Sequence, residues 1–267
     1  MSKTGKPSNR DLIILEWPKR VEDPAILPLS LRNPFLEWAG DSLSGCNAVY
    51  IPKQTRQKRS LPCLLACRDN CFLVLQEDRG RELIRHEFRT LDISALRWSR
   101  ILLDCGLEFH YCMDGADHSV FIPFNRAQDK LFLPFINTAT GNTPDFDCTA
   151  AEAAHPRPRM LRKQNVALYN YSVDGYRMGP DLDSYVYFEL ALKRHLLGPV
   201  PRGQVLLASC QKGSFLVEFY PGNQEIQMHF LPSAHAAVRK NKSVYTVQLD
   251  QASQAYLTLR SKSDPAF

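Results

Sequence analysis

Residues 61–77 read LPCLLACRDNCFLVLQE and carry the clearest indication of how this chain folds. Two apolar runs stand on either side of the polar tripeptide Arg68-Asp69-Asn70. Apolar runs of strand length that are separated by a short polar turn are typical of a β-hairpin. We therefore expect a hairpin at the centre of the fold, with this tripeptide as its turn.

A similar pattern returns far downstream. The segments LLAS at 206–209 and FLV at 215–217 echo LLAC at 64–67 and FLV at 72–74, with one extra residue in the turn. This echo predicts that the chain is a tandem of similar β units.

The composition indicates a folded protein. A length of 267 residues suits one large or two modest domains, and we favour two. The hydrophobic fraction of 44% and the charged fraction of 23% exclude disorder along most of the chain. The net charge of +5 favours anionic partners only weakly. Because the sequence has no apolar stretch of signal-peptide or transmembrane length, we expect a cytoplasmic protein without a transmembrane segment.

The expected fold class is mainly β, of the α+β type, in four segments. Residues 1–45 form an N-terminal extension with a short helix, in which Asn33 is the N-cap and Pro34 the first helical residue. Residues 46–139 form an antiparallel β unit that ends in a helix, which Pro134 should kink or end. Residues 140–181 form a basic linker marked by prolines. Residues 182–267 contain a helix and a second, smaller antiparallel β unit.

Alternating runs predict the strands, and Asp114-Gly115 predicts a tight hairpin turn. The most regular helical pattern covers 181–197 and stops at Gly198-Pro199. The expected strands are 47–52, 83–89, 93–103, 107–112 and 119–124 in the first unit, and 205–209, 215–220, 225–230, 243–249 and 256–260 in the second.

The run LLACRDNCFLVL at 64–75, the strand-like segment 93–103 and the sequence FIPFN at 121–125 together carry a family resemblance. On these residues the first unit resembles the bacterial pleckstrin-homology-like (PH-like) domains. The resemblance covers about residues 46–138 and rests on hydrophobic patterns. It implies an antiparallel barrel or sandwich that is plugged by a C-terminal helix. It also implies that basic loops at the open end of the barrel bind acidic lipid headgroups.

Three of the eight cysteines, Cys63, Cys67 and Cys71, are separated by three residues each. In the usual zinc knuckle two residues separate the paired cysteines. We therefore interpret these three as buried structural thiols in a reducing compartment.

A second candidate metal site is formed by His110, Cys112 and His118, which flank the turn at Asp114-Gly115. They could converge on a metal ion, but a fourth ligand is not evident, and we favour a cross-strand polar pair. We expect neither a metal nor a cofactor.

The sequence contains no catalytic signature that we can read. It has no G-x-S-x-G elbow, no H-E-x-x-H motif and no glycine-rich phosphate loop. His86 and Glu87 are adjacent in an alternating strand, so their side chains should point to opposite faces. An enzyme with a site assembled from distant residues remains the alternative to a binding protein.

Basic residues gather in three clusters, each of which could equally be a solvated loop. Because aromatic residues are not interleaved with them, nucleic-acid binding is disfavoured. We predict a binding or scaffolding module that engages an acidic lipid surface, or a protein partner or second copy through a strand edge. The candidate anion-binding residues are Lys53, Arg56, Lys58 and Arg59 in the first cluster and Arg157, Arg159, Arg162 and Lys163 in the second; the third cluster is Arg239-Lys240-Asn241-Lys242.

Overall fold

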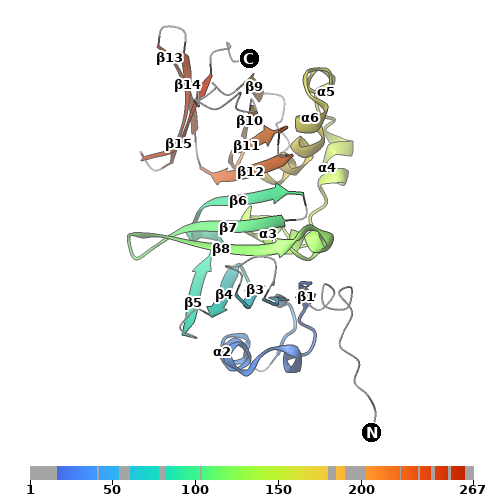
Figure 1. Ribbon diagram of the computed structural model, residues 1–267, viewed down its shortest axis with the longest axis vertical. Coiled ribbons are helices and arrows are strands. Elements are labelled where there is room, and N and C mark those ends of the chain that lie inside the picture. Colours follow the sequence, from blue (N-terminus) through green and yellow to red (C-terminus); the bar gives the residue numbers. More distant parts are fainter. Residues whose placement is uncertain are drawn as a thin grey trace.

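The chain folds mainly into antiparallel β-sheets with a few helices, as the composition and strand patterns predict (Figure 1). The computed structural model describes residues 17–40, 42–53, 61–77, 82–102, 104–179, 185–189, 203–222, 224–233, 235–241, 244–251 and 254–261.

A five-stranded sheet contains the predicted central hairpin. In spatial order its strands are β1 (Lys19–Arg20), β2 (Asn47–Ile51), β3 (Cys63–Arg68), β4 (Cys71–Glu77) and β5 (Leu83–Arg89). The turn between β3 and β4 is formed by Asp69 and Asn70, whose φ angles are 50° and 64°. Asp and Asn adopt this left-handed backbone more readily than other non-glycine residues. The hairpin prediction is confirmed.

Strands β3 and β4 of this sheet are buried on both faces, which explains why they are continuously apolar. On one face Leu64 packs in the same cluster as Leu31 of helix α2 (Leu29–Ala39). On the other face Leu65 and Val74 belong to the main core. A strand that is buried on both faces has no position left for a regular polar alternation.

Helix α2 follows a 3-10 turn, η1 (Pro24–Ile26), and begins earlier than predicted. Asn33 and Pro34 lie inside the helix and are neither its N-cap nor its first residue. Leu31 and Phe35 are one turn apart and completely buried against the sheet, so the helix extends one turn further toward the N-terminus.

A seven-stranded sheet combines strands from both halves of the chain. In spatial order it contains β8 (Ala116–Asn125), β7 (Asp104–Met113), β6 (Ile93–Ile101), β12 (Glu225–Pro232), β11 (Gly213–Tyr220), β10 (Gln204–Cys210) and β9 (Tyr185–Glu189). Strands β6 and β12 pair in antiparallel register, with Trp98 opposite Met228. The two β units predicted from the sequence therefore share one sheet.

The first unit ends in two short helices. After η2 (Thr90–Asp92) and the three strands β6–β8, the chain forms η3 (Arg126–Leu131) and α3 (Leu133–Ala139). The break between η3 and α3 falls at Phe132, and Pro134 lies in the first turn of α3. The single helix predicted to bend or end at Pro134 is instead two helices, and Pro134 lies at the start of the second, where a proline is tolerated. Phe135 and Ile136 of α3 are buried in the main core.

Residues 140–181, predicted as a linker, instead contain packed helices. These are α4 (Cys148–Ala154), α5 (Arg159–Gln164), α6 (Val166–Ser172) and η4 (Val173–Met178). Leu161 and Leu168 place this segment in the main core, where they are 2% and 0% exposed. The prolines that suggested a linker separate short helices: Pro158 immediately precedes the first residue of α5.

The helix predicted at 181–197 is wrong for the part that the structure describes. Tyr185–Glu189 form strand β9, which pairs with β10 at the outer position of the seven-stranded sheet. Val186 is buried opposite Leu207, so the segment gains burial and backbone hydrogen bonds as a strand. The rest of the predicted helix lies outside the described residues.

A third sheet contains β13 (His235–Asn241), β14 (Val244–Gln251) and β15 (Gln254–Ser261) in that order. Strands β14 and β15 were predicted, and β13 was not. None of the helices in the described ranges is long and apolar enough to cross a membrane.

Candidate functional site

The second basic cluster lies on helix α5 and the residues around it. Leu161 anchors α5 to the core, whereas Arg159, Arg162 and Lys163 are exposed. None of these three forms an ion pair with a residue that the structure describes. In Figure 1, α5 lies beside α6 at the outer margin of the molecule. The helix therefore presents three cations to solvent while Leu161 packs into the core.

Arg157 belongs to the same cluster in sequence but has a different environment. Its Nε donates to Glu152 Oε1 at 2.7 Å, and its Nη1 donates to the Tyr169 carbonyl oxygen and to Ser172 Oγ. Its guanidinium carbon lies 4.0 Å from the centre of the Tyr169 ring, and its side chain is only 8% exposed. This arginine ties α4 to α6 and so acts as an internal support for α5.

Two apolar side chains that are close to these cations in sequence are also exposed. Met160 and Val166 are each 58% exposed. The sequence contains no Asp or Glu between Glu152 and Asp174. We call Arg159, Met160, Arg162, Lys163 and Val166 the α5 surface. The cations were predicted from the sequence and the apolar residues were not, because residues 140–181 were expected to form a linker without buried and exposed sides.

The other two predicted clusters are described only in part. Lys53 is exposed just after β2, whereas Arg56, Lys58 and Arg59 lie outside the described residues. In the third cluster, Arg239 to Asn241 are in strand β13, and Lys242 lies outside the described residues. The structure therefore does not bring these clusters together with the α5 surface in any described contact.

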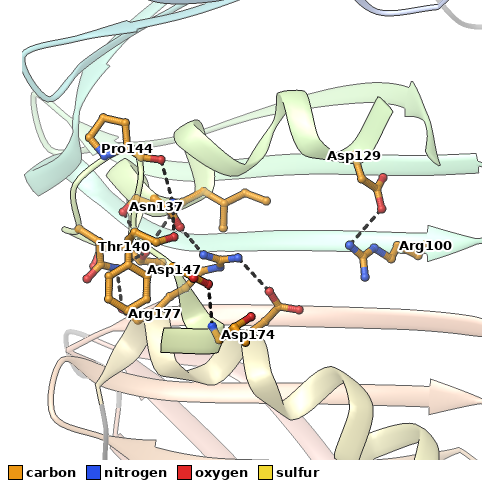
Figure 2. Close-up of polar contacts among 12 residues, drawn as sticks. Arg100, Asp129, Asn137, Thr140, Pro144, Asp147, Asp174 and Arg177 are labelled. Carbon is orange, nitrogen blue, oxygen red and sulfur yellow. Dashed lines mark hydrogen bonds and ion pairs between the residues drawn. The ribbon is translucent and has the colours of Figure 1, made fainter. Parts of the chain in front are cut away.

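A buried polar network connects α3 and η4 (Figure 2). Arg177 donates through Nη1 to Asn137 Oδ1 and through Nη2 to Asp174 Oδ1, the latter at 3.1 Å. Asn137 in turn donates from Nδ2 to the carbonyl oxygens of Pro144 and Phe146, at 2.9 and 3.1 Å. The network joins α3 of the first unit to η4, which follows α6.

Lys212, in the turn between β10 and β11, reinforces this junction. Its Nζ donates to the carbonyl oxygens of Thr140 and Gly141 and to Asn142 Oδ1, at 3.2, 3.3 and 2.5 Å. A cation at the C-terminal end of α3 complements the partial negative charge of the last carbonyl groups. Partial burial lowers the pKa of Lys212 below its usual value.

An open cleft of about 1150 Å³ lies at the same junction. It is bounded by residues 90–94, the end of α3, Lys212, Ser233 and the β7–β8 hairpin. The hairpin contributes His110, Cys112 and His118, the three residues considered as metal ligands. Across the described ranges, no group of three or more His, Cys, Asp or Glu side chains is placed to hold a metal ion.

The register of the hairpin explains why these three side chains do not converge. His110 is opposite Ser119, while His118 is opposite Tyr111 and stacks on its ring, with the ring centres 5.3 Å apart. Because neighbouring residues of a strand point to opposite faces, His110 and His118 project on different sides of the hairpin.

The cysteines of the central hairpin are free, and Cys63 and Cys67 are buried. Burial raises the pKa of each of these two thiols to about 12. They are therefore protonated at neutral pH, as expected of structural thiols.

Comparison of the chain with known protein families and with curated proteins gives no match.

Proposed function

We propose that this protein is a non-catalytic binding module that attaches to an anionic surface through the α5 surface. The proposal rests on a difference between residues of one basic cluster: one cation is paired inside the protein and three are exposed. Arg157 has its partners inside the protein, whereas Arg159, Arg162 and Lys163 face solvent without an ion-pair partner among the described residues. Three cations held on one short helix create a local positive potential that a negatively charged surface can meet.

The architecture supports a PH-like identity for residues 46–139 as part of this proposal. The unit consists of antiparallel strands in two packed sheets, followed by helix α3, whose apolar residues fill the core between them. In our proposal the protein works in the cytoplasm, where the inner leaflet of the membrane and many protein partners offer negative charge.

The proposal is tested by retention of the full chain on immobilised heparin, used as a generic anionic surface. We expect R159Q/R162Q/K163Q to elute at clearly lower salt than the wild type. The matched control is K19Q/R20Q/K130Q, which removes the same charge from exposed cations elsewhere. Elution of both triple variants at the same salt concentration would contradict the proposal, because net charge alone would then explain retention.

A second candidate is assembly through a strand edge. Strand β8 is the outer strand of the seven-stranded sheet, and its residues 116–119 are exposed. An exposed edge offers unpaired backbone groups to a strand of another chain. Sedimentation velocity over a range of protein concentrations tests self-association, and a constant monomer mass would remove it.

A further inference from the structure

We propose that the open cleft at the junction of the two units binds a small, uncharged, planar aromatic molecule, which stacks on the ring of His118. This site is separate from the α5 surface and shares no residue with it. Three features support it: a stack of rings that ends at the cleft, an apolar floor, and charged side chains that are already paired within the protein.

Three rings from three strands form a nearly parallel stack that ends at the cleft. Phe88 of β5 stacks on Tyr111 of β7, with the ring centres 4.2 Å apart and the ring planes at 15°. Tyr111 stacks in turn on His118 of β8, at 5.3 Å and 20°. Phe88 and Tyr111 are buried, whereas His118 is exposed and lines the cleft. Because Tyr111 covers one face of the imidazole, the opposite face is the one that a further ring can cover.

The stack is held in place by a residue at its side. The hydroxyl of Tyr111 and Nδ1 of His86 are hydrogen-bonded at 2.8 Å, and the two rings meet edge to face at 89°. This bond ties the hairpin that carries His118 to strand β5 of the five-stranded sheet. A binding surface that is already ordered loses little conformational entropy when a ligand binds.

The floor of the cleft is apolar. Ile93, Ala139 and Met178 line the cleft and also belong to the main core, where each is less than 5% exposed. Leu91 lies at the margin of the cleft and is 90% exposed. Sites for small molecules are lined mainly by apolar side chains, and a cleft of about 1150 Å³ has room for two fused rings. An aromatic ligand on this floor would remove apolar surface from water.

Two charged side chains of the cleft are paired within the protein. Lys212 Nζ donates to three oxygen atoms around the end of α3. Asp92 Oδ2 accepts from the backbone N and the Nε of Arg89, at 2.8 and 3.2 Å, and Asp92 Oδ1 accepts from Arg89 Nη2 at 3.0 Å. Asp117 also borders the cleft, but it is next to His118 in β8 and therefore points to the other face of the strand. These pairings favour an uncharged ligand, because a charged one would compete with them.

The experiment is an NMR titration of the full chain at neutral pH with 2-naphthol and with decahydro-2-naphthol, its saturated and non-planar counterpart. The methyl resonance of Met178, which lines the cleft, reports binding in every variant. We expect 2-naphthol to bind about fivefold more tightly than the saturated alcohol, because only the planar ring can stack. We also expect the imidazole C–H resonances of His118 to move upfield, as they do beneath an aromatic ring.

Three variants separate stacking from general apolar binding. H118A removes the ring and should lose about fivefold in affinity for 2-naphthol, whereas H118F keeps a ring and should bind as well as the wild type. H155A is the matched control, because His155 is exposed and lies outside the cleft, and it should bind as the wild type does. All three change exposed side chains, and equal melting temperatures verify that they are folded.

The proposal is overturned if the two alcohols bind equally tightly, because the cleft then selects apolar volume and not planarity. It is also overturned if H118F loses as much affinity as H118A, or if 2-naphthol leaves the resonances of Met178 and His118 unchanged up to its solubility limit. None of these results bears on the α5 surface, which is tested separately by its own charge variant.

Discussion

Arg177 and Asn137, which are forty residues apart in sequence, are hydrogen-bonded inside the protein, where they are 4% and 2% exposed. This contact joins the helix that closes the first β unit to the helical segment that carries the α5 surface. Asp174 completes the network by accepting from Arg177. The network thus adds a buried polar link to the pairing of β6 with β12, which also joins the two halves.

Replacement of Arg177 by Met should therefore destabilise the protein strongly. The change leaves Asp174 without its ion-pair partner in a buried site, and we expect a loss of about 3 kcal/mol in the free energy of unfolding. The matched control is R85M, because Arg85 pairs with Glu87 at the surface, and we expect a loss below about 1 kcal/mol. Urea unfolding measures both, and equal losses would contradict the structural role of the network.

Stability should also depend on pH through Glu218. Burial opposes its ionisation, but hydrogen bonds with His229 and Tyr220 outweigh burial and lower its pKa below the usual value. A carboxylate whose pKa is lowered by folding stabilises the protein above its unfolded pKa of about 4.3, and this stabilisation disappears as pH falls through the folded pKa.

We therefore expect E218Q to be less stable than the wild type by about 2 kcal/mol at pH 7. The difference between the two proteins should shrink as the pH falls below about 4. Urea unfolding at a series of pH values measures this difference. A difference that stays constant down to the lowest pH at which both fold would refute the assigned role of Glu218.

Two glycines with positive φ should differ in their tolerance of alanine. At Gly213, with φ 142°, a Cβ would lie 2.1 Å from the carbonyl oxygen of Leu231, which is backbone and cannot turn away. At Gly45, with φ 73°, a Cβ would meet no atom within 4 Å. We expect G213A to cost about 3 kcal/mol and G45A about 1 kcal/mol of the free energy of unfolding. Equal costs in thermal or urea unfolding would show that the close contact at Gly213 is unimportant.

The thiols should react in an order set by burial. Cys112 is exposed, whereas burial raises the pKa of Cys63 to about 12. Brief labelling of the native protein with a maleimide, followed by mass spectrometry of peptides, should find Cys112 modified and Cys63 intact. Labelling of Cys63 at the rate of Cys112 would exclude the buried position of β3.

The sequence predicted those elements whose stability is local. The β3–β4 hairpin and the β7–β8 turn were predicted because Asp69-Asn70 and Asp114-Gly115 suit a left-handed backbone by themselves. Helices α4 to α6 were not predicted because their short, proline-separated segments are stabilised by contacts made after folding, such as Arg157 with Glu152. Strand β9 was mistaken for a helix because its preference is decided by pairing with β10.

The sequence predicted the cations of the candidate site but not which of them are exposed. Arg157, Arg159, Arg162 and Lys163 look equivalent there, and only the structure separates the internal Arg157 from the three exposed cations. The exposure of Met160 likewise depends on which side of α5 packs on the core.

The central claim is that the cations of α5 bind an anionic surface, and it is tested most directly by the affinity of the full chain for vesicles containing phosphatidylserine. The measurement compares the wild type with R159Q/R162Q/K163Q and with the charge-matched K19Q/R20Q/K130Q at low and at physiological salt. We predict about a 100-fold loss at low salt for the α5 variant, a smaller loss at physiological salt, and near wild-type affinity for the control. Equal affinities for the wild type and the α5 variant, or no binding by the wild type at low salt, would contradict the account.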